Sequence, residues 1–354
     1  MDSIIEEPQV TNIATLERFC VAPSAATVEK EINYSLLARR FAGICVMLAA
    51  TAAVAQIYPA KAVRLIVPFP PGGNIDITAR TIAPGLSESL GQQVVVDNRG
   101  GAGGIIGAEL VAKAAPDGYN LVLGSSGTIT IAPTLYAKAP YTLDSFTAIC
   151  PVANAPLVLE IHPSIPAKSV QQFIALARSR PERMTMASSG NGTTNHLAGE
   201  LFQMDTGVHF SHIPYKGSGP ALVELIAGQV ELMFDQLSSS SSFLKSGKLR
   251  GLAVTTANRT QLFPELPTLA EAGVKGYEAS TFAGIMGPAG MPREIVDKLN
   301  AAAMKVLAQS ATRERFASIG SDVLGGTPDQ FEEFLKRDYA KWSRVIKQAK
   351  VKIE

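Results

Sequence analysis

The segment RLIVPFPPGGNIDITARTIAPGLSESLGQQVVVD, residues 64–97, predicts a strand, a glycine-containing loop, a helix and a second strand. RLIVPF (64–69) is a continuous apolar run of strand length. Apolar residues then recur at helical spacing through IDITARTIAPGLSESL (75–90), and QVVVDN (93–98) is again rich in β-branched residues. Strands and helices that alternate in this way are typical of βα units with parallel strands.

A second segment repeats this order. Residues 183–215 read RMTMASSGNGTTNHLAGELFQMDTGVHFSHIPY, which is again strand, Gly loop, helix and strand. The alternation predicts an α/β fold with a mixed, mostly parallel sheet flanked by helices. About 300 residues of this pattern exceed one ordinary core, so two domains are expected. The C-terminal stretch predicts helices, the last over 328–348 with the only tryptophan, Trp342.

Composition excludes several classes of protein. The 354 residues are 46% hydrophobic and 18% charged, which is too apolar for a disordered chain. Lys plus Arg number 32 against 31 Asp plus Glu, so there is no basic excess for nucleic acid or an anionic membrane surface. The three cysteines, Cys20, Cys45 and Cys150, build neither a disulfide framework nor a four-thiolate zinc site. Cys150 lies in an apolar run, which favours a buried, unreactive thiol.

The N-terminal region predicts export. Arg39 and Arg40 precede the apolar run FAGICVMLAATAAVA (41–55), which ends in the small-x-small pattern that a signal peptidase cuts. We expect cleavage after Ala55 and a mature chain that begins at Gln56. The run is shorter than the roughly 20 residues that cross a bilayer, so a permanent anchor is the weaker alternative. The acidic residues further upstream are unlike a signal peptide and suggest a later translation start.

The two Gly loops predict an anion site. In open α/β sheets the ligand crevice lies at the carboxyl ends of the strands, where a Gly-rich turn exposes the first amides of the next helix. Gly72 and Gly73 in one loop, and Gly190 and Gly192 in the other, leave backbone N–H groups unshielded. Two such loops can hold a small anion between two helix N-termini. The alternative is that both loops are only tight βα turns.

Other motifs support no cofactor, metal or catalytic site. GAGGIIG (101–107) lacks the spacing of a dinucleotide loop, and no acidic residue ends the next strand. Neither GSSGT (124–128) nor ASSGNG (187–192) fits the G-x-S-x-G pattern of hydrolases. His209 and His212 point to opposite faces of an expected strand, which does not suggest zinc. The serine run 238–242 predicts a helix start, with a flexible ligand loop as the alternative.

Five long motifs resemble a known family. They are RLIVPFPPGGNIDITAR (64–80), VVVDNRGGAGGIIGAELVAKAAPDGYNLVLGSSGT (94–128), MASSGNGTTNHLAGELF (186–202), HIPYKGSGPALVELIAGQVELMFD (212–235) and GLAVTTANRTQLFPELPTLAEAG (251–273). In this order they resemble the Bug family, the substrate-binding receptors of tripartite tricarboxylate transporters. The resemblance runs from Tyr58 nearly to the C-terminus.

The resemblance implies a two-domain periplasmic binding protein of type II topology, a Venus flytrap without enzymatic activity. One domain would comprise residues 56–155 and 282–354, and the other residues 156–281, with hinges near 152–157 and 277–284. The implied protein is a periplasmic monomer that uses no cofactor or metal. It would bind a small organic carboxylate and deliver it to the membrane permease of a tripartite transporter.

In that family the ligand carboxylate is held by loops that correspond here to residues 69–76 and 188–193, with further contacts from 125–128, Gly127 included. The implied ligand-binding residues are Phe69, Gly72, Gly73, Asn74, Ile75, Asp76, Ser125, Ser126, Thr128, Ser188, Ser189, Gly190, Asn191, Gly192, Thr193, Tyr215, Lys216 and Asp235. Asp76 has the alternative of a first-turn acid on its own helix. Lys216 has the alternative of a solvated loop lysine.

The sequence does not decide which carboxylate is bound or which partner receives it. Ile75 stands where members of the family that the chain resembles often carry a small or polar residue, so we expect a mono- or dicarboxylate with an apolar body rather than citrate. A periplasmic sensor subunit for a signalling partner would use the same pocket. An α/β hydrolase is a third hypothesis, which would require Ser125 or Ser188 as nucleophile.

Overall fold

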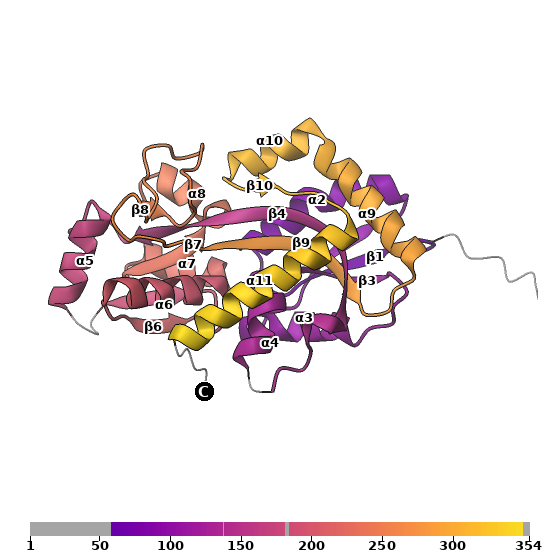
Figure 1. Cartoon of the computed structure of the whole chain (residues 1–354). Coiled ribbons are helices and arrows are strands. Elements are labelled where there is room, and N and C mark those ends of the chain that lie inside the picture. Colours follow the sequence, from indigo (N-terminus) through magenta and orange to yellow (C-terminus); the bar gives the residue numbers. More distant parts are fainter. Residues whose placement is uncertain (1–57, 137, 181–183, 350–354) are drawn as a thin grey trace, which may run out of the picture. The chain divides into compact units, whose positions relative to one another are not determined.

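The computed structural model describes residues 58–136, 138–180 and 184–349 (Figure 1). The expected signal peptide and its cleavage site at Ala55 lie outside the described residues. Within the described ranges, no helix combines the length and apolar character that crossing a membrane requires.

In the part of the chain that the structure describes, ten strands form one mixed sheet. Along the hydrogen-bonded path the order is β2-β1-β3-β9-β4-β7-β5-β6, and β8 and β10 both pair with β4. The strands are β1 (Val63–Val67), β2 (Val94–Asn98), β3 (Asn120–Ser125), β4 (Phe146–Ile161), β5 (Thr185–Ser188), β6 (Ser211–Pro214), β7 (Leu232–Gln236), β8 (Arg250–Val254), β9 (Ser280–Pro288) and β10 (Asp322–Val323).

The expected parallel βα pattern occurs at both ends of this sheet. Strand β1 pairs in parallel with β2 and β3, and β5 pairs in parallel with β6 and β7. The long central strands β4 and β9 are antiparallel to each other. Strand β4 pairs with β9 as far as Pro156, and from Leu157 it pairs with β7 and β8. We call β1–β3 with their helices the β1 half and β5–β8 with theirs the β5 half.

Helices flank both halves (Figure 1). They are α2 (Asn74–Leu90), α3 (Ile105–Ala112), α4 (Ala132–Leu135), α5 (Val170–Ser179), α6 (Thr194–Thr206), α7 (Ser218–Ile226), α8 (Leu237–Lys245), α9 (Arg293–Ala308), α10 (Ser310–Ser318) and α11 (Pro328–Ala349), with a helical turn η2 (Ser126–Ile131) after β3. The predicted last helix is α11. The serine run lies inside α8, so the helix interpretation of that run is correct and the flexible-loop alternative is wrong.

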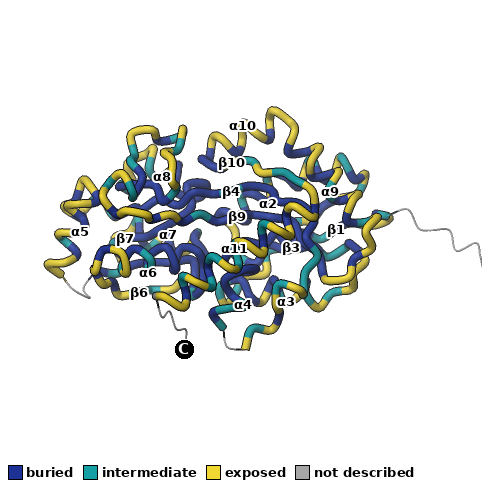
Figure 2. The backbone as a smooth tube through the Cα atoms, in the orientation of Figure 1, coloured by how far each residue is buried: buried dark blue, intermediate teal, exposed yellow. Residues whose placement is uncertain are grey.

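The core has a large cluster in each half, and the strands are the most buried elements (Figure 2). In the β1 half, Leu65 and Ile82 pack with Leu299 of α9. The β5 half is built around Phe202 and Phe234, and this cluster also takes in residues of η2, α4 and α11. Helix α11 therefore ties the two halves together.

Two residues singled out in the sequence are buried in these cores. Trp342 is fully buried in the cluster of the β5 half. Cys150 is fully buried in the β1 half, and burial raises the pKa of its thiol to about 12. A thiol that stays protonated at neutral pH is a poor nucleophile, so the inert interpretation of Cys150 is confirmed.

Candidate functional site

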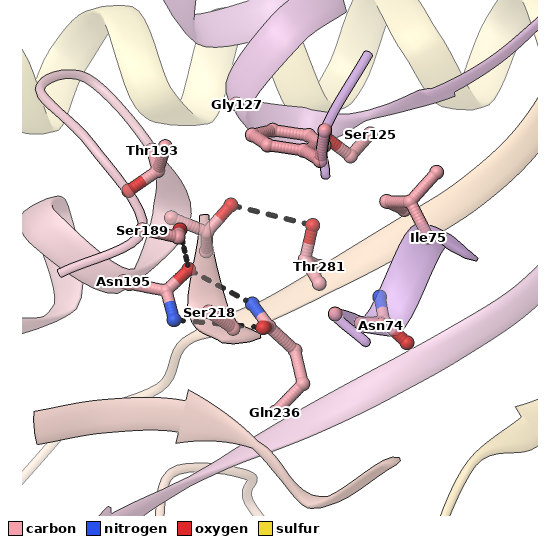
Figure 3. A pocket seen from close by; sticks show the side chains of 13 residues that line it. Asn74, Ile75, Ser125, Gly127, Ser189, Thr193, Asn195, Ser218, Gln236 and Thr281 are labelled. Atoms are coloured by element: carbon pink, nitrogen blue, oxygen red, sulfur yellow. Dashed lines mark hydrogen bonds between the residues drawn. The ribbon is translucent and has the colours of Figure 1, made fainter. Parts of the chain in front are cut away.

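A narrow cavity lies between the two halves, where the carboxyl ends of β1 and β3 face those of β5 and β7. The cavity has a volume of about 30 Å³, which is enough for a water molecule or a narrow polar group. The lining residues are Phe69, Gly73, Asn74, Ile75, Ser125, Gly127, Ser189, Thr193, Thr194, Asn195, Ser218, Gln236 and Thr281 (Figure 3).

Most of these residues stand at the starts of helices. Gly73 is the N-cap of α2, Thr193 the N-cap of α6 and Gln236 the N-cap of α8, while Ser218 is the first residue of α7. Ser125 is the N-cap of η2. First-turn amides of a helix have no intrahelical acceptor, and they carry the positive end of the helix dipole. No described Lys, Arg or His lines the cavity, so we attribute its attraction for an anion to backbone amides.

The loop between β1 and α2 is shaped by a buried carboxylate. Asp76 accepts hydrogen bonds from the Gly72 amide at 3.0 Å, Arg80 Nε at 2.9 Å and Asn98 Nδ2 at 3.0 Å. Gly72 has φ +93°, a conformation that favours glycine. Although burial raises the pKa of Asp76, these hydrogen bonds outweigh burial and hold the pKa below its usual value. Asp76 does not line the cavity, so its contacts order the loop.

The loop between β5 and α6 is also closed by internal hydrogen bonds. The Gly190 amide donates to Ser188 Oγ at 3.1 Å, and the Gly192 amide donates to His196 Nδ1 at 3.2 Å. Thr193 Oγ1 donates to the Gly190 carbonyl at 2.8 Å. The expectation that the Gly72, Gly190 and Gly192 amides stand unshielded toward a ligand is therefore not met, because each of them donates to a side chain of its own loop or of the helix that follows.

The structure divides the predicted residues into two groups. The first group lines the cavity and comprises Phe69, Gly73, Asn74, Ile75, Ser125, Ser189 and Thr193. Gly127, from the implied 125–128 segment, lines it too. Those that lie outside the lining are Gly72, Asp76, Ser126, Thr128, Ser188, Gly190, Asn191, Gly192, Tyr215, Lys216 and Asp235. The second group mostly flanks or supports the first, as Asp76 does in its loop.

Sequence reasoning missed five lining residues. They are Thr194, Asn195, Ser218, Gln236 and Thr281. Four of them directly continue a helix start whose loop was already singled out, so counting first-turn positions as part of each loop would have found them. Thr281 is at the start of β9, where no local sequence signal marks it.

A buried polar network lies behind the cavity. Asp235 Oδ1 accepts from Ser218 Oγ at 2.6 Å and from Asn195 Nδ2 at 2.7 Å. On its other side, Ser240 Oγ lies 3.1 Å from Asp235 Oδ2 and 2.9 Å from Glu160 Oε1. Both carboxyl groups are fully buried. Burial and the neighbouring Asp235 charge raise the pKa of Glu160 well above its usual value.

Direct hydrogen bonds join the two halves beside the cavity. Ser238 Oγ donates to Asn74 Oδ1 at 2.6 Å, and Tyr136 OH donates to the Asn191 carbonyl at 3.0 Å. Figure 3 shows Ser189 and Asn195 on one side of the cavity and Asn74 and Ile75 on the other. The two halves therefore meet around the cavity with little free space between them.

Ser188, one of the two serines that a hydrolase would require, is not placed to act as a nucleophile. Ser188 Oγ lies 2.6 Å from His212 Nε2, yet Ser188 is fully buried and does not line the cavity. The His212 ring stacks on His196 with centroids 4.0 Å apart. Burial lowers the pKa of His212 to about 3, aided by His196. Among the described residues, no three or more His, Cys, Asp or Glu are grouped to hold a metal ion.

Comparisons with known proteins give the chain a context. A family model described as "Tripartite tricarboxylate transporter family receptor" matches residues 78–351. BugT of Bordetella pertussis is 38% identical over 302 residues, which cover 85% of this chain and 93% of BugT. The resemblance to the Bug family is thereby confirmed.

Solved structures agree with this match. An R. palustris protein solved with adipate is 39% identical, with 83% of this chain and 99% of that chain covered and a TM-score of 0.81. MatC from Rhodopseudomonas palustris, solved with bound malate, is 32% identical, with coverage of 82% and 100% and a TM-score of 0.79. These comparisons confirm the binding-protein fold and the prediction that the chain is a receptor rather than an enzyme.

Proposed function

Because this chain belongs to the tripartite tricarboxylate transporter receptor family, we propose that it captures a small organic carboxylate in the cavity between its two halves and delivers it to a membrane permease. One observation carries the proposal: the starts of α2, α6, α7 and α8 converge on a cavity whose lining, among the described residues, holds no cationic side chain. Adipate and malate, the ligands named for two similar structures, are both carboxylates.

The free energy that helix N-termini gain from a nearby negative charge is large enough to support carboxylate binding. A favourable charge at one helix N-terminus gains about 0.3–1 kcal/mol when exposed and up to ~2 kcal/mol when partly buried. Four termini together with direct amide hydrogen bonds can offset the desolvation of one carboxylate. Phe69 and Ile75 add an apolar side to the cavity, which suits a ligand with a hydrocarbon body.

Binding would involve closure of two lobes. We assign residues 56–155 and 282–354 to one lobe and 156–281 to the other. Strand β4 changes partners between Pro156 and Leu157, and β9 begins at Ser280, so both lie where hinges at 152–157 and 277–284 are expected. Hinge closure around a ligand is a common motion of two-lobed binding proteins.

The proposed setting is the periplasm, with export through a signal peptide cleaved after Ala55 and a monomeric mature protein. A ligand-sensing subunit for a signalling partner is the alternative, and it would use the same cavity. Co-purification with a permease would support transport. A ligand-dependent complex with a sensor kinase would support the alternative.

The proposal is tested by calorimetric titration of the purified exported protein with dicarboxylates and monocarboxylates. A ligand at a hundredfold excess over Kd stabilises the fold by about 2.7 kcal/mol, which also raises the melting temperature. Gly73→Val places methyl groups against Ser218, whose Cβ is 3.7 Å from a Cβ built at Gly73, and should abolish binding. Ala301→Val, at an exposed position of α9, is the control. Unchanged affinity in Gly73→Val would contradict the proposed site.

A further inference from the structure

The cavity carries two kinds of polar surface. Helix starts supply N–H donors, as described above. On the side of the β5 half, the polar side chains Ser189, Asn195 and Ser218 are already joined to partners behind or beside the cavity. The direction of those hydrogen bonds decides what the side chains can still offer to a ligand.

The charge of Asp235 sets that direction. Ser218 and Asn195 donate to its Oδ1, and Ser239 donates to its Oδ2 at 2.7 Å. Glu160, in contrast, has Ser240 as the partner of Oε1, and its buried Oε2 has none among the described residues. The carboxyl group with more donors is the one that holds the negative charge. Burial raises the pKa of Asp235 as well, but its donors counteract this, so we assign the negative charge to Asp235 and the proton to Glu160. With the charge there, Ser240 Oγ donates to Asp235 Oδ2 at 3.1 Å.

An ionised Asp235 fixes the hydrogens of the side chains in front of it. Ser218 has one hydroxyl hydrogen, and it is committed to Asp235. Asn195 uses both amide hydrogens, toward Asp235 and the Phe234 carbonyl. The hydroxyl of Ser189 donates to Asn195 Oδ1 at 2.7 Å (Figure 3). Ser218 and Ser189 consequently face the cavity with lone pairs and no free hydrogen.

We propose that the cavity selects carboxylates that carry a hydrogen-bond donor, a hydroxyl or an ammonium group, and that Ser218 is the residue that accepts from it. This inference rests on the proposed function. The carboxylate takes the N–H donors of the helix starts, and the donor group of the ligand meets the Ser218 oxygen, with Asp235 behind it. A ligand without a donor leaves that oxygen unpaired, which costs affinity.

Matched ligand pairs test the inference on the unmodified protein. Calorimetry compares malate and aspartate with succinate, and lactate and alanine with propionate. Within each set we expect the ligand with the donor to bind at least about tenfold more tightly than the parent acid. Malate and lactate test the hydroxyl, and aspartate and alanine test the ammonium. Equal affinities within both sets would overturn the inference, whereas no binding of any carboxylate would overturn the proposed function itself.

Two variants distinguish the role of Ser218 as acceptor from the role of the hydrogen bonds around Asp235. Ser218→Ala removes the acceptor, so the ratio of malate to succinate affinity should fall toward one while succinate affinity changes little. Ser239→Ala removes another donor to Asp235 without touching the cavity lining and should keep the ratio. A Ser218→Ala protein that keeps the full ratio, or a Ser239→Ala protein that loses it equally, would contradict the role of Ser218. Melting curves of both variants confirm that they fold.

Discussion

Three buried acids show how local partners decide the role of a residue. Gly72 in the loop and Arg80 in α2 donate to Asp76 and help to hold its pKa below the usual value. The charge that we assign to Asp235 is stabilised by donors that line the cavity. Among the described residues Glu160 has Ser240 as its one side-chain partner, and burial raises its pKa well above the usual value. The sequence indicated that Asp76 and Asp235 matter, but it could not indicate that they act from behind the cavity. That depends on which donors the fold brings within hydrogen-bonding distance.

Glu160→Gln should flatten the pH dependence of stability. The pKa of Glu160 is raised in the folded protein, so above about pH 4.3 the unfolded chain loses this proton while the folded chain keeps it. Folding then takes up one proton, and the folding equilibrium constant falls roughly tenfold per pH unit until the folded pKa is reached. Urea denaturation from pH 5 to 8 should show the wild type losing stability relative to the variant.

The exposed substitution Glu294→Gln is the control for that measurement. Parallel pH profiles for wild type and Glu160→Gln would show that Glu160 is ionised in the folded protein. That result would also reverse the assignment of charge between Glu160 and Asp235.

Asp76→Asn tests a pKa shift of the opposite direction, in which the folded protein lowers the pKa of the carboxyl group. The pKa of Asp76 is lowered, so its stabilising contribution is complete above the unfolded pKa of about 3.9 and is lost as pH falls through the folded pKa. The variant should lose about 1–3 kcal/mol of unfolding free energy at pH 7, because a buried charged acceptor is replaced. The difference should shrink as the pH falls below 4. A constant difference across this range would contradict the account of the loop.

At the scale of elements, the sequence predicted the βα units well and the site only in part. Strand, loop and helix patterns located β1 with α2 and β5 with α6, because apolar periodicity is a local signal. The antiparallel crossing of β4 and β9 depends on pairing between residues more than 100 positions apart, which no local pattern encodes. Thr281 was missed for the same reason, since β9 brings it to the cavity.

The burial of Trp342 on helix α11 predicts how the protein responds to substitution at that position. Trp342 is fully buried in the cluster of the β5 half, and its indole Nε1 has no hydrogen-bond partner among the described residues. Trp342→Ala should cost about 3–5 kcal/mol through the cavity that it leaves. Trp342→Phe should cost clearly less, because it retains an aromatic ring that fills most of the same space. Circular dichroism in urea measures both, and equal losses would indicate a polar role for the indole.

At the scale of the whole molecule, the two halves approach each other through glycines. A Cβ built on Gly103 would lie 2.5 Å from the Asn191 carbonyl oxygen, on the other side of the cavity. Gly190 lies on the facing side, where an added Cβ would lie 3.3 Å from Gly103 Cα. Backbone approaches this close are available only where side chains are missing. The glycines beside the cavity thus serve closure as well as the shape of their loops.

Gly103→Ala should hinder closure. The added methyl group presses on Asn191, so ligand affinity should fall at least about tenfold, and small-angle scattering with ligand should show a more open molecule. Gly91→Ala is the matched control, because Gly91 has nearly the same φ, +68° against +65°, and nothing lies within 4 Å of its built Cβ. If both variants bind as the wild type does, the halves do not meet at Gly103 in the bound protein.

The position of Trp342 gives the molecule an optical reporter of its own. It is the only tryptophan in the chain, and α11 buries it in a cluster that contains Leu135 beside one half and Phe202 in the other. If the halves separate, the packing around the indole changes, and its emission wavelength and quenching change with it. Intrinsic fluorescence can therefore follow opening and closing in stopped-flow experiments without an attached dye.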